Sequence, residues 1–223
     1  MHKIGNLWLI GTSHISPESV KEVRKVILEN EVDIVAIELD KGRFLSLMGK
    51  KSKIRIREIR RIGVKGFLFM LLGAWVEEQL GKVVKTKPGA EMKSAVKAAA
   101  KIKARIALID QNINITLKRL FKEITWKEKF RFVWDIIKGV VLRKQEIEGF
   151  DLRKVPSENM IAKLVDKVKD RYPSIYKTLI HERNIVMANR LVKMMQREED
   201  KKIVAVVGAG HVRGMMEIIK KKI

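Results

Sequence analysis

Four short apolar runs divide the chain, and each ends at a glycine or a carboxylate. They span residues 7–10, 34–38, 106–110 and 203–207. Continuous apolar runs of this length are typical of strands that are buried on both faces, as in parallel sheets. Between the first two runs, Ser16-Pro17-Glu18 has the capping hydroxyl, the proline and the acid of a helix start. This order predicts a parallel βαβ unit.

The middle of the chain, roughly residues 41–200, is predicted to be mainly helical because its apolar positions recur every three or four residues. A final helix follows the last strand. The first and last segments share the order strand, Gly-x-x-His, helix, so we expect the two ends of the chain to lie in one sheet. The prediction is a single α/β domain over residues 1–223, with a mixed or mainly parallel central sheet and a large helical insertion.

Charge and composition narrow the choice of partners. The chain carries 48 Lys and Arg against 26 Asp and Glu, a formal net charge of +22, and no cysteine. This balance favours anionic partners such as a membrane surface, and it fits a solvated basic surface equally well. The apolar segment 66–76 is shorter than the roughly 20 residues of a membrane span. It is expected to be a buried helix, with a membrane surface or a homo-oligomer contact as alternatives.

Polar side chains follow all four predicted strands: His14, Glu38, Asp110 and His211. Ligands of open parallel sheets bind at the carboxyl ends of the strands, so these side chains are expected at one edge. Without cysteine, a metal site must use His, Asp or Glu. Two histidines and a carboxylate suit a divalent cation that keeps positions open for water.

The turns that hold the two histidines span residues 11–14 and 208–211. Glycine allows the backbone to turn sharply, to approach a ligand and to present amide donors. The candidate substrate-binding residues of these turns are Gly11, Thr12, Ser13, Gly208 and Gly210. His2 is a poor candidate because it lies at a terminus that is expected to fray.

Two strand-end carboxylates and one arginine have alternative roles. Glu38 and Asp110 could each satisfy free amides at a helix start. That role is favoured for Asp110, which is kept as a substrate-binding candidate, whereas Glu38 is favoured as a general base or metal ligand. Arg183 lies within the apolar stripe of a helix, so it needs a buried partner. It either pairs with a nearby carboxylate or reaches the strand-end site and stabilises negative charge there.

Other common sites are absent from the sequence. There is no P-loop and no nucleophile elbow, and Gly208-x-Gly210 lacks the third glycine of a dinucleotide-binding turn. The basic segment 119–144 contains Trp126, Phe130 and Trp134 at helical spacing. These rings are expected to pack in the core, so nucleic acid is not expected as a partner.

Six motifs follow one another along the chain: Leu9-Ile10-Gly11-Thr12-Ser13-His14, Val35-Ala36-Ile37-Glu38-Leu39-Asp40, Pro88-Gly89-Ala90-Glu91-Met92, Ala107-Leu108-Ile109-Asp110, Glu182-Arg183-Asn184 and Val206-Val207-Gly208-Ala209-Gly210-His211-Val212. In order and spacing they resemble the TraB/PrgY (pheromone shutdown) family, which is related to GumN and to the Tiki proteases. The resemblance implies an α/β core shared with Tiki, erythromycin-esterase-like and haem-binding ChaN-like proteins.

The resemblance also implies a chemistry, because in Tiki-like relatives this site is associated with metal-dependent peptide cleavage. His14 and His211 would then be metal ligands, Glu38 the catalytic base or a ligand, and Arg183 the catalytic electrophilic partner. Glu91 becomes a substrate-binding candidate through this match alone. Relatives commonly continue into a hydrophobic region, which implies a cytoplasmic domain that is membrane-associated in the full-length protein.

The sequence therefore predicts a metal-dependent hydrolase, a peptidase that acts on a peptide substrate with Mn, Co or Zn as its cation. One alternative is a non-catalytic module that sequesters a peptide or small molecule in the same cleft. The other is an adaptor that binds a membrane surface.

Overall fold

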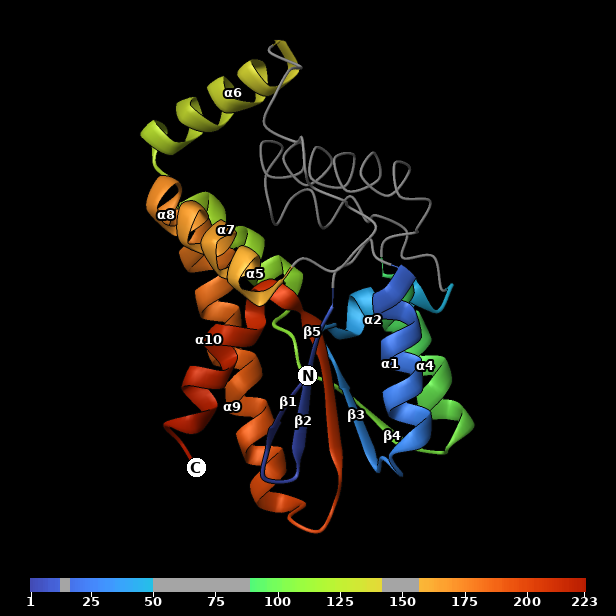
Figure 1. Cartoon of the computed structure of the whole chain (residues 1–223). Coiled ribbons are helices and arrows are strands. Elements are labelled where there is room, and N and C mark those ends of the chain that lie inside the picture. Colours follow the sequence, from blue (N-terminus) through green and yellow to red (C-terminus); the bar gives the residue numbers. More distant parts are fainter. Residues whose placement is uncertain (13–16, 50–88, 142–156) are drawn as a thin grey trace.

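The computed structural model describes residues 1–12, 17–49, 89–141 and 157–223. Five strands form one sheet: β1 (His2–Ile4), β2 (Leu7–Thr12), β3 (Ile34–Ile37), β4 (Arg105–Leu108) and β5 (Ile203–Gly208), in the order β1-β2-β5-β3-β4 (Figure 1). β1 pairs antiparallel with β2, and every other pair is parallel. The mixed, mainly parallel sheet of an α/β protein is thus confirmed.

β1 is the strand that the sequence analysis missed, and its expectation of a frayed terminus at His2 is wrong. His2 lies opposite Leu9 in the β1–β2 pair. The turn between the two strands contains Gly5, whose φ of 53° suits glycine. A strand of three residues, of which two are only half-buried, is too short for an apolar pattern to reveal.

Helices cover both faces of the sheet, so the molecule has three layers (Figure 1). On one face lie α1 (Pro17–Glu29) and α4 (Ala90–Lys101), and on the other lie α9 (Glu182–Arg197) and α10 (Ala209–Lys220). Side chains of β5 alternate between the two cores: Val204 and Val206 pack on the α1/α4 side, and Ala205 on the α9/α10 side. A strand buried on both faces explains why the run 203–207 is apolar throughout.

The remaining described helices are α2 (Lys41–Leu47), α5 (Ile113–Glu123), α6 (Trp126–Val141), α7 (Glu158–Arg171), α8 (Pro173–Tyr176) and the π-helix η1 (Lys177–His181). α6 extends away from the layered body (Figure 1). The expectation that its aromatic rings pack in the core is wrong, because Trp126, Phe130 and Trp134 are 68%, 72% and 58% exposed. The segment does form a helix, as the spacing predicts, but spacing alone does not show whether another element faces the apolar stripe.

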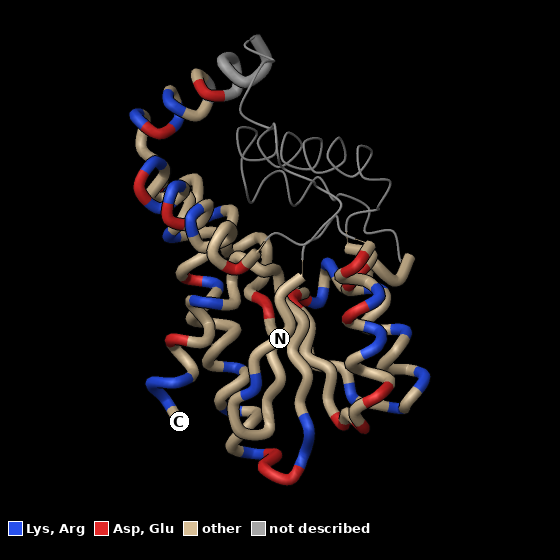
Figure 2. Tube along the Cα trace, viewed as in Figure 1, with Lys and Arg blue, Asp and Glu red and all other residues tan. Residues whose placement is uncertain are grey.

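Charged residues lie on the helices and near the ends of the strands, and the central strands carry almost none (Figure 2). Within the described ranges, no helix combines the length and the apolar character that a membrane span requires. The apolar segment 66–76 lies outside the described residues, as do Ser13 and His14.

Candidate functional site

The two glycine turns begin side by side at the carboxyl edge of the sheet. β2 and β5 are neighbours, and their parallel register places Thr12 opposite Gly208. The Thr12 hydroxyl donates to the carbonyl oxygen of Val207 at 3.2 Å. This confirms that the two ends of the chain lie in one sheet.

A glycine is required where the first turn meets α10. A Cβ atom at Gly11 would lie 2.7 Å from a methyl carbon of Val212 and 3.3 Å from the Cα of Ala209. The missing side chain therefore lets the start of α10 lie directly against β2.

Arg183, on α9, is the centre of a buried charged cluster at this edge. Its Nε and Nη2 atoms donate to the two carboxylate oxygens of Asp110 at 2.9 and 2.8 Å, and Nη2 also donates to Glu38. The three side chains are 14%, 2% and 4% exposed, respectively. Burial alone would lower the pKa of Arg183, but the charge of Glu38 and the hydrogen bonds to Asp110 outweigh it and raise the pKa above its ordinary value.

Glu38 connects this cluster to the start of α10. Its Oε2 accepts from the backbone N–H of Gly208 at 2.6 Å, and its Oε1 lies 3.3 Å from Nε2 of His211. Gly208 is the N-cap residue of α10, where backbone amides and the helix dipole favour a negative charge. The carboxylate is thus held by a guanidinium and a main-chain amide, and an imidazole lies beside it.

His211 is fixed in orientation by Asn184. Its Nδ1 lies 2.6 Å from Oδ1 of Asn184, and its Nε2 lies 3.2 Å from Nη1 of Arg183. Because the amide oxygen can only accept, Nδ1 carries the hydrogen in this arrangement. In the neutral ring, Nε2 then presents its lone pair toward Arg183 and the Glu38 carboxylate.

The structure therefore brings four of the candidate residues together: Glu38, Asp110, Arg183 and His211. Arg183 pairs with carboxylates, as the first alternative expected, and it does so at the strand ends. Glu38 also has the helix-start role, because it accepts from the Gly208 amide at the start of α10, whereas neighbouring residues, and not Asp110, cap α2 and α5. Asp40 accepts from the first amides of α2, and Asn112 caps α5.

The other described candidates lie at strand ends and helix starts of the same fold. Gly11, Thr12 and Gly208 lie at the ends of β2 and β5, and Gly210 lines an adjoining pocket. Glu91 is 1% exposed in the first turn of α4. Since α4 leads into β4, this turn lies at the carboxyl edge of the sheet. Whether Ser13 and His14 complete the site stays a prediction.

Two further residues belong to the site although the sequence analysis gave them no role. Asn184 is 2% exposed and orients His211, and Arg43 adds a second ion pair to Asp110 at 3.1 Å. A polar amide within an apolar helical stripe needs a buried partner, so Asn184 could have been found by the reasoning that selected Arg183. Arg43 lies in a basic stretch that gives no such signal.

A π-helical turn precedes both Arg183 and Asn184. η1 spans Lys177–His181, and the carbonyl oxygen of Leu179 within it accepts from Nη1 of Arg183 at 3.1 Å. Single π turns inside α-helices often occur at functional sites. Here the turn is directly linked to the guanidinium that organises the cluster.

Two glycines of α10 provide a matched test of how Asn184 is held. A Cβ at Gly214 would lie 2.4 Å from Nδ2 of Asn184, whereas a Cβ at Gly210 would lie at an ordinary 3.6 Å from Val165. Gly214→Ala is expected to lower the free energy of unfolding by about 1–3 kcal/mol and to shift the His211 ring resonances. Gly210→Ala is expected to change the free energy of unfolding by at most about 1 kcal/mol. Urea unfolding and imidazole NMR spectra measure both effects, and equal behaviour of the two variants would contradict the role of Asn184.

The fold and the site together define a class of protein. It is a three-layer α/β protein in which a buried arginine, two carboxylates and a histidine meet at the carboxyl edge of a mainly parallel sheet. The TraB/PrgY/gumN family model matches residues 2–222, and the chain belongs to this family.

Its relatives include archaeal and mammalian proteins. The chain is 35% identical over 222 residues to an uncharacterized protein of Methanocaldococcus jannaschii, covering 97% of this chain and 54% of the relative. It is 26% and 25% identical over 239 residues to the TraB domain-containing proteins of Homo sapiens and Mus musculus, covering 94% of this chain and 61% of each relative. The chain thus spans little more than half the length of these relatives.

Proposed function

We propose that this domain is a hydrolase that cleaves a peptide at the cluster around Arg183, with a divalent cation as cofactor. The observation that carries the proposal is that Glu38 is buried beside His211 at the strand ends. This side chain is 4% exposed and lies 3.3 Å from the His211 imidazole, at the strand ends where ligands of parallel sheets bind. Buried carboxylates with specific charged partners in such places are candidates for acid–base chemistry.

The chemistry of the donor atoms fits a divalent cation. Nε2 of His211 and Oε1 of Glu38 are close enough to share one ion, and a borderline cation takes imidazole nitrogen and carboxylate oxygen. Among the described residues no group of three or more His, Asp and Glu is arranged to hold a metal, and His14 is the predicted further ligand. When bound, the cation would polarise the scissile carbonyl and lower the pKa of a bound water.

The chain's own residues have distinct roles in this proposal. Glu38 accepts the proton of the attacking water, with His211 beside it, and this proton passes to the amine that leaves when the C–N bond breaks. The positive charge of Arg183 at the strand ends stabilises the negative charge that develops on the carbonyl oxygen. Asn184 keeps the imidazole in one orientation, and Asp110 does the same for the guanidinium.

A pair of histidine variants tests the activity. A peptide library is incubated with the wild-type domain in Mn²⁺, Co²⁺ or Zn²⁺, and cleavage is followed by mass spectrometry. His211→Ala is expected to lower kcat/KM by about 100-fold or more, because the group beside Glu38 is lost. The control is His181→Ala, an exposed histidine in η1, with kcat/KM expected within about twofold of wild type.

Measuring cation binding separately from cleavage tests the metal site independently of the peptidase activity. His211→Ala is expected to weaken cation binding by at least about tenfold. Equal cation binding by the variant and the wild type would show that His211 is not a metal ligand. Peptide binding without turnover under every cation would instead favour a module that sequesters its ligand.

A further inference from the structure

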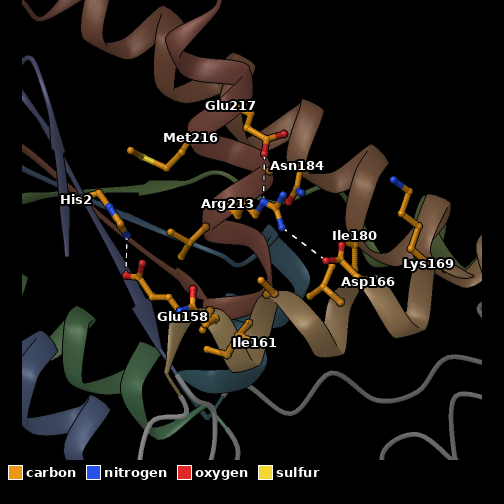
Figure 3. Close-up of a pocket in the computed structure, with 18 of the residues that line it drawn as sticks. His2, Glu158, Ile161, Asp166, Lys169, Ile180, Asn184, Arg213, Met216 and Glu217 are labelled. Atoms are coloured by element: carbon orange, nitrogen blue, oxygen red, sulfur yellow. Dashed lines mark hydrogen bonds and ion pairs between the residues drawn. The ribbon is translucent and has the colours of Figure 1, made fainter.

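A pocket of about 630 Å³ adjoins the cluster and is separate from it. It lies between α7 and α10, and the end of β2 reaches it at Gly11 (Figure 3). Asn184 lines the pocket and also contacts Nδ1 of His211 at 2.6 Å. One side chain therefore joins the pocket to the proposed catalytic histidine, and the volume lies within the roughly 300–1,000 Å³ of typical ligand sites.

The floor of the pocket is apolar. Ile161 and Val165 face it from α7, and Val212 and Met216 face it from α10; each pair is four residues apart, on one side of its helix. α7 has no buried residue, and its side chains Ile161 and Val165 are only half-buried. The two helices therefore face each other across a hollow that an apolar group can fill.

The rim of the pocket differs in charge from the rest of the chain. Its acidic side chains are Glu22, Glu158, Asp166 and Glu217, and its lysines and arginines are Lys169, Arg213 and Lys220. His2 also lines it and contacts Glu158 at 2.8 Å. Arg213 is engaged by Asp166 at 3.7 Å and by Glu217 at 3.3 Å (Figure 3). Lysine and arginine outnumber acids 48 to 26 over the whole chain, but acids outnumber them four to three here.

We propose that this pocket binds an apolar side chain of a peptide segment that is neutral or positively charged. The apolar floor favours burial of the side chain, and the rim does not favour a negative charge beside it. The proposal deepens the proposed function, on which it rests, because a side chain held here would place the adjoining peptide bond next to Asn184, which contacts His211.

Three probes that share one side chain and differ in charge test the pocket by binding alone. They are phenylalaninamide, which is a cation, N-acetyl-phenylalaninamide, which is neutral, and N-acetyl-phenylalanine, which is an anion. Isothermal titration and NMR shift mapping on the whole chain are expected to place the first two beside Val165 and Met216. The anion is expected to bind at least about tenfold more weakly, a difference of about 1.4 kcal/mol.

Two neighbouring positions of α7 give a matched pair of variants. Val165→Trp fills the pocket and is expected to weaken the neutral probe at least about tenfold. Leu164→Trp adds the same ring at a side chain that is 45% exposed and does not line the pocket, so binding is expected to be unchanged. Circular dichroism shows whether both variants are folded.

Opposite results overturn the proposal. Tighter binding of the anion would indicate attraction by the basic surface, and equal loss in both variants would place the probe elsewhere. The experiment measures binding and involves no cleavage. Absent binding of the probes would therefore contradict the proposed pocket and leave the proposed function untouched. Failure of the proposed function appears as the expected binding of the cationic and neutral probes without peptide turnover.

Discussion

Replacing Arg183 with Met is expected to lower the free energy of unfolding by about 3–5 kcal/mol. The substitution leaves Glu38 and Asp110, whose side chains are 4% and 2% exposed, without the guanidinium that contacts both. The cost of the uncompensated buried charge exceeds the net value of the ion pairs themselves, because the carboxylates are out of water and no longer face the guanidinium. Urea unfolding at neutral pH measures the difference.

The control for this variant is Arg105→Met. Arg105 pairs with Glu198 at 2.5 Å, but its side chain is 58% exposed, so its loss is expected to cost at most about 1 kcal/mol. A loss of similar size in both variants would show that the buried Arg183 cluster contributes no more to the free energy of unfolding than an exposed ion pair. Retention of full stability by Arg183→Met would contradict the buried arrangement itself.

Glu38→Gln is expected to lower kcat/KM for peptide cleavage by about 10²–10⁴-fold, because an amide cannot accept the proton of the attacking water. The shape of the side chain is kept, but one oxygen becomes an NH₂ group. That group must face either the Gly208 N–H or Arg183, and both are donors. One donor–donor contact is unavoidable, so the free energy of unfolding is expected to fall by about 1–3 kcal/mol.

Two further variants show whether the effects of Glu38→Gln come from the loss of this particular carboxylate. Glu198→Gln changes a carboxylate of a surface ion pair and is expected to leave cleavage unaffected. The double variant Glu38→Gln/Arg183→Met is expected to lose less stability than the sum of the single variants, because the two groups interact directly. Additive losses would mean that Glu38 and Arg183 are held independently.

The parallel core and the location of the site could be predicted from the sequence for a physical reason. Strands buried on both faces are apolar throughout, so a charged side chain at the end of such a strand stands out. That contrast selected Glu38, Asp110 and His211, and an arginine within an apolar stripe selected Arg183. The structure brings these four side chains together.

The other features of the fold depend on how elements pack against one another, which a single sequence does not show. β1 forms because the β2 edge is available for pairing, and its own three residues have no apolar pattern. The rings of Trp126 and Phe130 have the spacing of a buried face, but α6 extends beyond the layers that could cover them. The pocket beside Asn184 results from how two helices face each other, which no local motif encodes.

The π turn of η1 means that the site depends on the length of its helix as well as on its side chains. One added residue turns everything that follows by about 100° around the helix axis. α8 and α9 lie on opposite sides of this turn, so Tyr176 can face the pocket while Arg183 faces the strand ends. A change of one residue in the length of this helix could therefore dismantle the cluster while every residue of the cluster stayed the same.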